Sequence, residues 1–236
     1  MTLGPEAGMA TPALQSARLR AIAAMVLENQ AVADVGTDHA LLPVFLVSSG
    51  RVPHAVAVDV ARGPLRGAQQ HVDASNTQVK VRLGDGLQCL QPGEVQTVVM
   101  AGMGGPRMCR VLQRDQSHLT GVLRLVLQPN HGAEELRHVL QRMKWSVVEE
   151  TVVWEHGRPF EVIAFEPRHE HALSELDGWL GPRNVGRADT DSIRWVSWNL
   201  AQLQRERDKV PPTDSHRRNE MERRMALLDD LLGRWN

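Results

Sequence analysis

The 236-residue chain has no tyrosine and only two cysteines, Cys89 and Cys109. The two cysteines do not have the spacing of metal ligands, and neither lies in a catalytic sequence motif. We therefore expect two ordinary thiols in a reducing compartment and no bound metal. The chain also lacks an apolar run near the roughly 20 residues that a membrane span needs. Its first residues show no basic stretch followed by an apolar core, which is the pattern of a signal peptide. These absences predict a cytoplasmic protein with no membrane partner.

An excess of charge of one sign is missing as well, since 27 Lys and Arg stand against 28 Asp and Glu. A net charge near zero does not indicate a nucleic-acid binder, although a protein with this net charge can still have a basic face. The dinucleotide fingerprint G-x-G-x-x-G is also absent, because Asp38 and Ala40 follow Gly36 where glycines are expected. A carboxylate at that turn repels phosphate. These features argue against an oxidoreductase that uses a nicotinamide cofactor.

Segments with the pattern of buried strands alternate with helical segments over the first two thirds of the chain. The predicted strands are 31–35, 54–60, 78–83, 95–101, 122–128, 145–154 and 159–166. The predicted helices begin at about Leu14 and cover 39–50, 63–73, 105–114 and 133–143. Strands that are apolar on both faces predict a parallel sheet covered by helices on both sides. A short loop around Gly157 predicts that the last two strands form an antiparallel hairpin. A parallel five-stranded sheet finished by such a hairpin is the arrangement of class I methyltransferases, so the expected fold class is α/β and Rossmann-like, with a mostly parallel seven-stranded sheet.

The composition changes after about Pro167. Apolar residues recur at spacings of 3 and 4 over 193–203 and again over 221–235, with Pro211 and Pro212 between the two runs. This heptad pattern predicts an antiparallel helical hairpin of the coiled-coil type. Its basic residues form either a solvated helix surface or a surface that holds RNA phosphates; they are Arg205, Arg207, Lys209, Arg217, Arg218, Arg223 and Arg224. We expect a flexible leader at 1–13, a cofactor-binding catalytic domain at 14–167 and a C-terminal helical domain at 168–236.

Residues with ligand-binding chemistry follow the first three predicted strands. In such sheets a ligand lies beyond the carboxyl ends of the strands, where the strand order reverses. Gly36 lets the backbone approach a ligand closely, and Asp34 can orient the methionine part of a cofactor. Asp59 can accept hydrogen bonds from ribose hydroxyls, and Asp85 from the exocyclic amine of an adenine. The set fits S-adenosylmethionine, which carries a sulfonium cation and no phosphate.

Two further segments follow the fourth and fifth predicted strands. AGMGG (101–105) offers nearly side-chain-free positions for close backbone contact with a ligand. The Asn/Asp-Pro-Pro-aromatic motif, usual here in enzymes that methylate exocyclic amines, is absent. In QPN (128–130), Gln128 and Asn130 can bind the polar edge of a base, or the segment is a turn with an amide cap.

Taken together, these segments resemble the bacterial tRNA (adenine-22-N1) methyltransferase family. The resemblance rests on Arg18–Leu19, VADVGTDHALLP (32–43), GPL (63–65), RLGDGL (82–87), MAGMGG (100–105), LQPN (127–130) and GRPFEVIAFE (157–166). The DHAxLP and AGMGG segments are its specific parts. It implies a Rossmann-like catalytic domain, a C-terminal coiled coil, and methyl transfer from S-adenosylmethionine to ring nitrogen 1 of an adenine in the tRNA D-loop region.

The resemblance also implies roles for single residues. The cofactor-binding residues that it implies are Asp34, Gly36, Asp59, Val60, Asp85, Gly86, Ala101, Gly102 and Met103. The implied catalytic residues are Asp38, His39 and Asn130, and the implied substrate-binding residues are Arg18, Gly104 and Gln128. For His39, a purely local role at the start of a helix stays open. Leu41 stands where an aromatic residue is expected, and Phe160 where tyrosine is frequent, so the stacking surface for the target nucleotide differs from the family pattern.

Other functions stay open from the residues alone. The cofactor residues would be the same in a class I methyltransferase that acts on another RNA, a protein or a small molecule. A non-catalytic RNA-binding protein with a relict cofactor fold is disfavoured, because Asp34, Gly36, Asp59 and Asp85 occur together with AGMGG. The expected partner is tRNA, and a monomer is favoured over a dimer, although heptads can also pair between chains.

Overall fold

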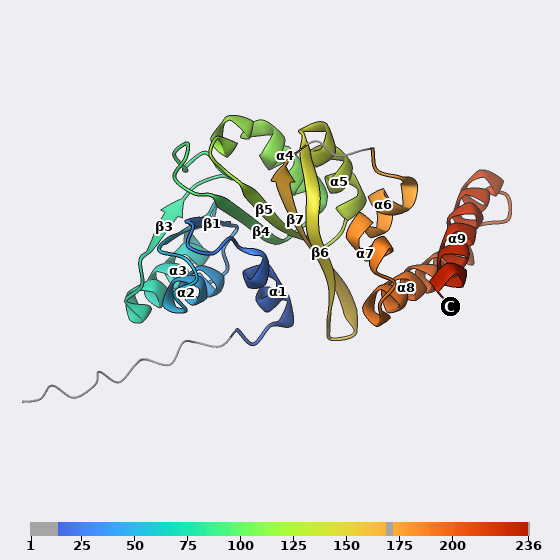
Figure 1. Ribbon diagram of the computed structural model, residues 1–236, viewed down its shortest axis with the longest axis horizontal. Helices are drawn as coiled ribbons and strands as arrows, with labels where there is room; N and C mark the ends of the chain where they lie inside the picture. The colour runs from blue at the N-terminus through green and yellow to red at the C-terminus, as the bar shows by residue number, and fades with distance from the viewer. Residues whose placement is uncertain (1–13, 169–171, 236) are drawn as a thin grey trace, which may run out of the picture.

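The computed structural model describes residues 14–168 and 172–235, so the predicted leader at 1–13 lies outside the described residues (Figure 1). Within these ranges one seven-stranded sheet has the order β3-β2-β1-β4-β5-β7-β6. The strands are β1 Val32–Val35, β2 Ala55–Asp59, β3 Val79–Leu83, β4 Thr97–Met103, β5 Arg124–Pro129, β6 Trp145–Glu155 and β7 Arg158–Pro167. Strands β1 to β5 are parallel, and β7 is antiparallel to both β5 and β6. The predicted sheet and its closing hairpin are confirmed.

Helices cover both faces of the sheet. One face carries α1 Ala17–Met25, α2 Leu41–Ser48 and α3 Arg62–Ser75, and the other carries α4 Gly105–Arg114 and α5 Ala133–Arg142 (Figure 1). Because side chains alternate across a strand, neighbouring residues of β4 enter different cores: Val98 packs under α4 and α5, whereas Val99 packs under α1 to α3. The two cores fix the sheet, and the sheet fixes the loops at its carboxyl edge.

The turn after β1 differs from the prediction. The helix expected from His39 begins at Leu41, because His39 and Ala40 both have left-handed backbone conformations with φ of 53°. This conformation is uncommon for residues with a Cβ. It carries the chain from the end of β1 into α2 in a sharp turn and leaves residues 36–39 at the carboxyl edge of the sheet.

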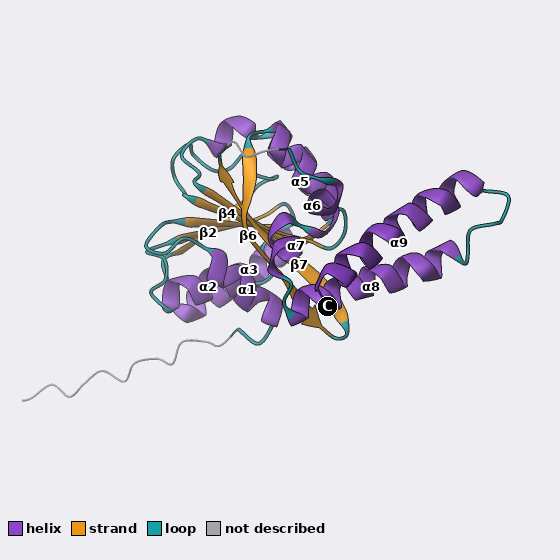
Figure 2. Ribbon diagram, turned by 45° about the vertical axis from the view of Figure 1, so that its right-hand side comes forward, coloured by secondary structure: helices purple, strands orange, loops and turns teal. Residues whose placement is uncertain are grey.

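The C-terminal region contains the expected hairpin of two long helices, α8 Thr190–Arg207 and α9 Ser215–Trp235, which project from the sheet domain (Figure 2). Two short helices that the sequence patterns do not predict, α6 Glu175–Leu180 and α7 Pro182–Arg187, join the hairpin to the sheet domain. Each spans under two turns, which is too short for a clear helical period.

The core of the hairpin is wider than a heptad seam. Val196, Met221, Met225 and Leu228 are buried as the spacing predicts, but Trp195 and Asn199 are buried beside them. The reason is that α8 packs against β6 as well as α9, so two of its faces are covered. In the described ranges, none of the helices combines the length and apolarity needed to cross a bilayer.

Candidate active site

Two cavities lie side by side at the carboxyl edge of the sheet. The first cavity, of about 350 Å³, lies between the loops that follow β2, β3 and β4. The second, of about 400 Å³, lies between α1, the start of α2 and the loops after β1, β4 and β5. Gly36, Ala101 and Gly102 line both cavities. A third cavity of about 500 Å³, near the ends of α1 and α2, is lined by none of the predicted site residues.

The first cavity collects the predicted cofactor-binding residues except Asp34. These are Gly36, Asp59, Val60, Asp85, Gly86, Ala101, Gly102 and Met103. The topology explains the gathering, since β1 lies between β2 and β4 and the crossover direction changes at this point. Arg107, on the first turn of α4, lines the same cavity and was not predicted, because a lone exposed arginine after a glycine-rich segment carries no pattern.

Two glycines expose backbone at the boundary between the cavities. Gly36 has φ of +83°, and a Cβ there would lie 2.8 Å from Cε of Met103. Gly102 has φ of +75°, and its Cβ position faces open space. The pairing of β4 with β5 shifts register between Ala101 and Met103, which turns this backbone out of the ladder. At this boundary a ligand therefore meets the main chain of Gly36 and Gly102.

The two predicted carboxylates of the first cavity are held differently. One oxygen of Asp59 accepts a hydrogen bond of 2.7 Å from the Ala61 amide, which fixes the carboxylate at the end of β2. One oxygen of Asp85 accepts a 2.7 Å hydrogen bond from Arg114, and the same guanidinium binds Asp115. These two carboxylates hold the pKa of Arg114 above its ordinary value. Arg114 and Asp115 thus support the loop after β3, a role that the sequence patterns did not indicate.

The second cavity has mixed chemistry. Its polar groups are the carboxylates of Asp34 and Asp38, the guanidinium of Arg18 and the amide of Asn130. Its apolar wall includes Leu19, Leu41 and Leu42. Leu41 occupies the position where an aromatic residue was expected, and it is 45% exposed, so it offers a planar ligand an aliphatic contact instead of a ring.

Asp34 is the buried carboxyl group of this cavity. Burial raises its pKa to about 6, the Thr37 side chain opposes that rise, and the charges of Asp38 and Asp59 add to it. Desolvation favours the neutral form of a carboxylic acid, whereas a nearby cation favours the charged form. A cationic ligand would therefore interact strongly with Asp34, because the positive charge of the ligand offsets the cost of burying the negative carboxylate.

Gln128 lies beneath the second cavity and is fully buried. Its Oε1 accepts hydrogen bonds of 3.1 Å from both Arg18 and the Gly102 amide. Its Nε2 donates to the Pro129 carbonyl at 3.0 Å. Asn130 in turn donates a 2.7 Å hydrogen bond to the Gly102 carbonyl. Gln128 thus holds Arg18 and the Gly102 loop in place from below, while Arg18 and Asn130 line the cavity.

The other two predicted residues lie beside the cavities. The His39 ring packs against α3, where a Cβ on Gly67 would lie 2.6 Å from its Nδ1, and its Nε2 is 3.4 Å from Asp38. Gly104 begins α4 beneath His131, and a Cβ there would lie 2.6 Å from the His131 ring. Neither residue is part of the lining of the two cavities.

Comparisons with known proteins agree with this arrangement. Residues 15–163 match the model of a methyltransferase domain family. The chain is 35% identical over 153 residues to the tRNA (adenine(22)-N(1))-methyltransferase of Bacillus subtilis, an alignment that covers 64% of each chain. A solved Streptococcus pneumoniae structure, of a putative tRNA (m1A22) methyltransferase, superposes with a TM-score of 0.88 at 29% identity and covers 93% of this chain and 100% of that one.

The same Streptococcus protein has also been solved in complex with S-adenosyl-L-methionine. That structure superposes with a TM-score of 0.84 at 28% identity, over 93% of this chain and 100% of the other. The family match covers well over half of the 236 residues and includes every residue that lines the two cavities. The chain therefore belongs to the methyltransferase domain family, in the group that resembles the tRNA (adenine-22-N1) methyltransferases.

Proposed function

We propose that this chain transfers a methyl group from S-adenosylmethionine to ring nitrogen 1 of an adenine in tRNA, at position 22 of the D-loop region. The observation that carries the proposal is the pair of cavities that meet at Gly36, Ala101 and Gly102. A donor in one and an acceptor in the other would meet at a boundary formed by two glycines and the small side chain of Ala101. The names of the relatives support this acceptor.

The first cavity fits S-adenosylmethionine by its chemistry. Asp59 and Asp85 present carboxylates to hydroxyl and amine donors, and Val60 adds an apolar contact at 54% exposure. The open Cβ position of Gly102 leaves space at the boundary between the cavities. Asp34, at the far side of that boundary, would favour the positive charge of the methionine part. When bound, the cofactor supplies an electrophilic methyl group. Among the described residues no cluster suited to a metal ion occurs.

The acceptor nitrogen needs little acid–base help. Its lone pair lies in the plane of the ring and is nucleophilic as it stands, so the main task of the protein is to hold it in line with the methyl group. Methylation leaves the base cationic. Asp34 and Asp38 both face the second cavity, and their negative charges stabilise the charge that develops there. Asp38 is the better placed of the two to meet the base, because its side chain is 85% exposed.

The remaining groups of the second cavity orient the nucleotide. Asn130 keeps one amide hydrogen on Gly102 and can use its other polar positions on the base edge. Arg18 stacks over the Phe160 ring at 5.0 Å from the centroid and can bind a phosphate. A paired adenine hides ring nitrogen 1, so the target must be unpaired or flipped out of its stack. The leucines of the cavity would contact the faces of the extruded base.

The helical hairpin is the proposed tRNA-docking unit, within a C-terminal domain of residues 168–236 that follows a catalytic domain of residues 14–167. Arg205, Lys209 and Arg217 are exposed near its far end, where they can neutralise phosphates. Arg223 and Arg224 are engaged instead in ion pairs with Glu175 and Glu134. The hairpin core closes between α8 and α9 of one chain, which favours a monomer.

The test is methyl transfer from labelled S-adenosylmethionine to three separate pools: unmodified tRNA, protein and small metabolites. Label recovered from tRNA as 1-methyladenosine supports the proposal. Label found only in protein or metabolites contradicts the acceptor while keeping the methyltransferase, which is the alternative that the sequence left open.

A further inference from the structure

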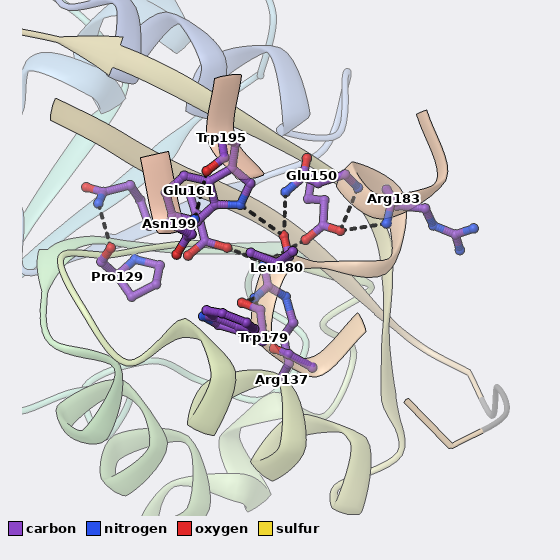
Figure 3. A network of polar contacts seen from close by, with 12 residues as sticks. Pro129, Arg137, Glu150, Glu161, Trp179, Leu180, Arg183, Trp195 and Asn199 are labelled. Atoms are coloured by element: carbon purple, nitrogen blue, oxygen red, sulfur yellow. Dashed lines mark hydrogen bonds and ion pairs between the residues drawn. The ribbon is translucent and has the colours of Figure 1, made fainter. Parts of the chain in front are cut away.

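A buried arginine joins the sheet domain to the C-terminal helices. Arg137 lies on α5 with a fully buried side chain, between Glu150 of β6 and Glu161 of β7 (Figure 3). Its guanidinium donates to Glu150 at 2.8 Å and also to Glu161. The second terminal nitrogen of the guanidinium, Nη1, donates to the carbonyls of Gly178 and Trp179, at 3.3 and 3.2 Å, near the end of α6. One side chain therefore binds α5, both strands of the hairpin and α6.

Glu150 continues the connection into α7. Its Oε1 accepts hydrogen bonds from the amides of Arg183 and Asn184, at 2.7 and 3.2 Å, and its Oε2 takes the contact from Arg137 (Figure 3). Gly181, between α6 and α7, has φ of +98°, and a Cβ there would collide with the Glu150 carboxylate. The turn between the two short helices is thus shaped around this carboxylate.

The next contacts lead into the long hairpin. The Leu180 carbonyl accepts a hydrogen bond from the indole of Trp195 on α8 and another from Asn184 (Figure 3). Leu180 and Trp195 also belong to the core that holds α8 and α9. We call the buried ionic cluster of Arg137, Glu150 and Glu161 the junction cluster. Buried contacts connect it to the N-terminal part of α8.

Strand β7 connects the junction cluster to the second cavity. Glu161 follows Phe160 on β7, and the Phe160 ring supports Arg18, which lines that cavity. The same strand therefore carries the anchor of the C-terminal helices and the platform of an acceptor-side residue. A second, half-buried brace connects α9 to α5, where Arg224 pairs with Glu134 at 3.2 Å.

We propose that the junction cluster is a positioning device that fixes the direction of the α8–α9 hairpin relative to the second cavity, and so determines which nucleotide of a docked tRNA reaches it. The part about tRNA rests on the proposed function. A fully buried charge group suits this task, because a buried ion pair tolerates few geometries even where it adds little net stability. The proposed device is therefore a specificity determinant that touches neither cofactor nor base.

The first test measures hairpin direction without RNA. Spin labels at Thr213→Cys, in the loop between α8 and α9, and at Gln70→Cys, on α3, report one distance across the junction in a background lacking Cys89 and Cys109. We expect Glu161→Gln to broaden the distance distribution. The matched control is Glu166→Gln, which also lies on β7 and pairs with Arg124 and Arg168, outside the junction cluster. A distribution as narrow as that of the unsubstituted protein in Glu161→Gln would overturn the proposal.

The second test measures the consequence for tRNA. In Glu161→Gln, we expect the KM for tRNA to rise about tenfold or more, because a hairpin with several directions is in the binding-competent one only part of the time. We also expect methylation at additional adenines, with S-adenosylmethionine affinity unchanged. Unchanged KM and unchanged position of methylation, in a variant that still binds the cofactor, would overturn the role in specificity.

A milder variant protects the test against unfolding. Glu161→Asp keeps the negative charge of the junction cluster and only shortens the side chain that Arg137 contacts, so we expect smaller changes in the same direction. If Glu161→Gln unfolds, a folded Glu161→Asp with an unchanged distance distribution and an unchanged KM would overturn the proposal. Because the distance measurement needs no RNA, inactivity of the unsubstituted protein on tRNA would count against the proposed function and not against the junction.

Discussion

Replacing Asp34 with asparagine should make the protein more stable while weakening cofactor binding. Asp34 is buried, with 7% of its surface exposed, and its pKa is raised from 3.8 to about 6, mainly by burial. A shift of one pKa unit corresponds to about 1.36 kcal/mol. The rise at Asp34 therefore means that the folded state holds the charged carboxylate at a cost of about 3 kcal/mol. Asparagine has nearly the same shape and no charge. We therefore expect Asp34→Asn to raise the free energy of unfolding at pH 7.5 by about 2–3 kcal/mol.

The sign and the pH window follow from the direction of the shift. The folded state holds the Asp34 proton more tightly than the unfolded state, so stability contributed by this group falls as pH rises from about 4 to about 6. Well below pH 4 the group is protonated in both states, and well above pH 6 it is charged in both. The difference in the free energy of unfolding between Asp34→Asn and the unsubstituted protein should therefore be small at pH 4, grow up to pH 6, and level off at higher pH.

Urea unfolding at pH 4, 5, 6 and 7.5 measures this gap, and Asp229→Asn, on the exposed surface of α9, is the control without a burial term. A gap that is absent at pH 7.5, or that is equally large at pH 4, would refute the argument from burial. Calorimetry on the same samples should show weaker S-adenosylmethionine binding by Asp34→Asn. A variant that unfolds less readily but binds S-adenosylmethionine more weakly is what we expect where a functional residue is held at a cost in stability.

Three further outcomes test the site and the hairpin. Asp59→Ala should weaken S-adenosylmethionine binding about 10- to 100-fold, since it removes charge-assisted hydrogen bonds; unchanged affinity in calorimetry would remove Asp59 from the cofactor site. Gly36→Ala should lower the free energy of unfolding by about 1–3 kcal/mol, because φ of +83° and the Met103 contact both oppose a Cβ, and a thermal melt equal to that of the unsubstituted protein would contradict this. Replacing Arg205, Lys209 and Arg217 together with alanine should weaken tRNA binding and flatten its salt dependence while sparing cofactor binding; an unchanged salt slope in filter binding would exclude the hairpin tip from the RNA contact.

The sheet was predictable because its determinants are local. Each parallel strand is a short apolar run ended by a polar or glycine-rich turn, and the short loop at Gly157 limits the last two strands to antiparallel pairing. The start of α2 was misplaced because nothing in the residue types of His39 and Ala40 indicates two successive left-handed conformations. The helices α6 and α7 were missed because contacts with Glu150 and Arg137, distant in sequence, define them.

The sequence could predict which residues line the cavities where those residues follow the end of a strand. Asp59, Asp85 and Gly102 line the first cavity for that reason, and Asp38 and Asn130 line the second. Gln128 follows the same rule, yet its side chain turns inward and holds Arg18. Position along a strand does not distinguish a residue that faces the ligand from one that supports it. The roles of individual residues stay predictions until variants are measured.

The most direct test of the central claim is the reaction itself on a single tRNA. The purified protein is incubated with labelled S-adenosylmethionine and an unmodified tRNA transcript that carries adenine at position 22, and with the same transcript carrying guanine there. We expect one equivalent of 1-methyladenosine in the first transcript and none in the second. Equal labelling of both transcripts, or a methylated nucleoside other than 1-methyladenosine, would contradict this expectation.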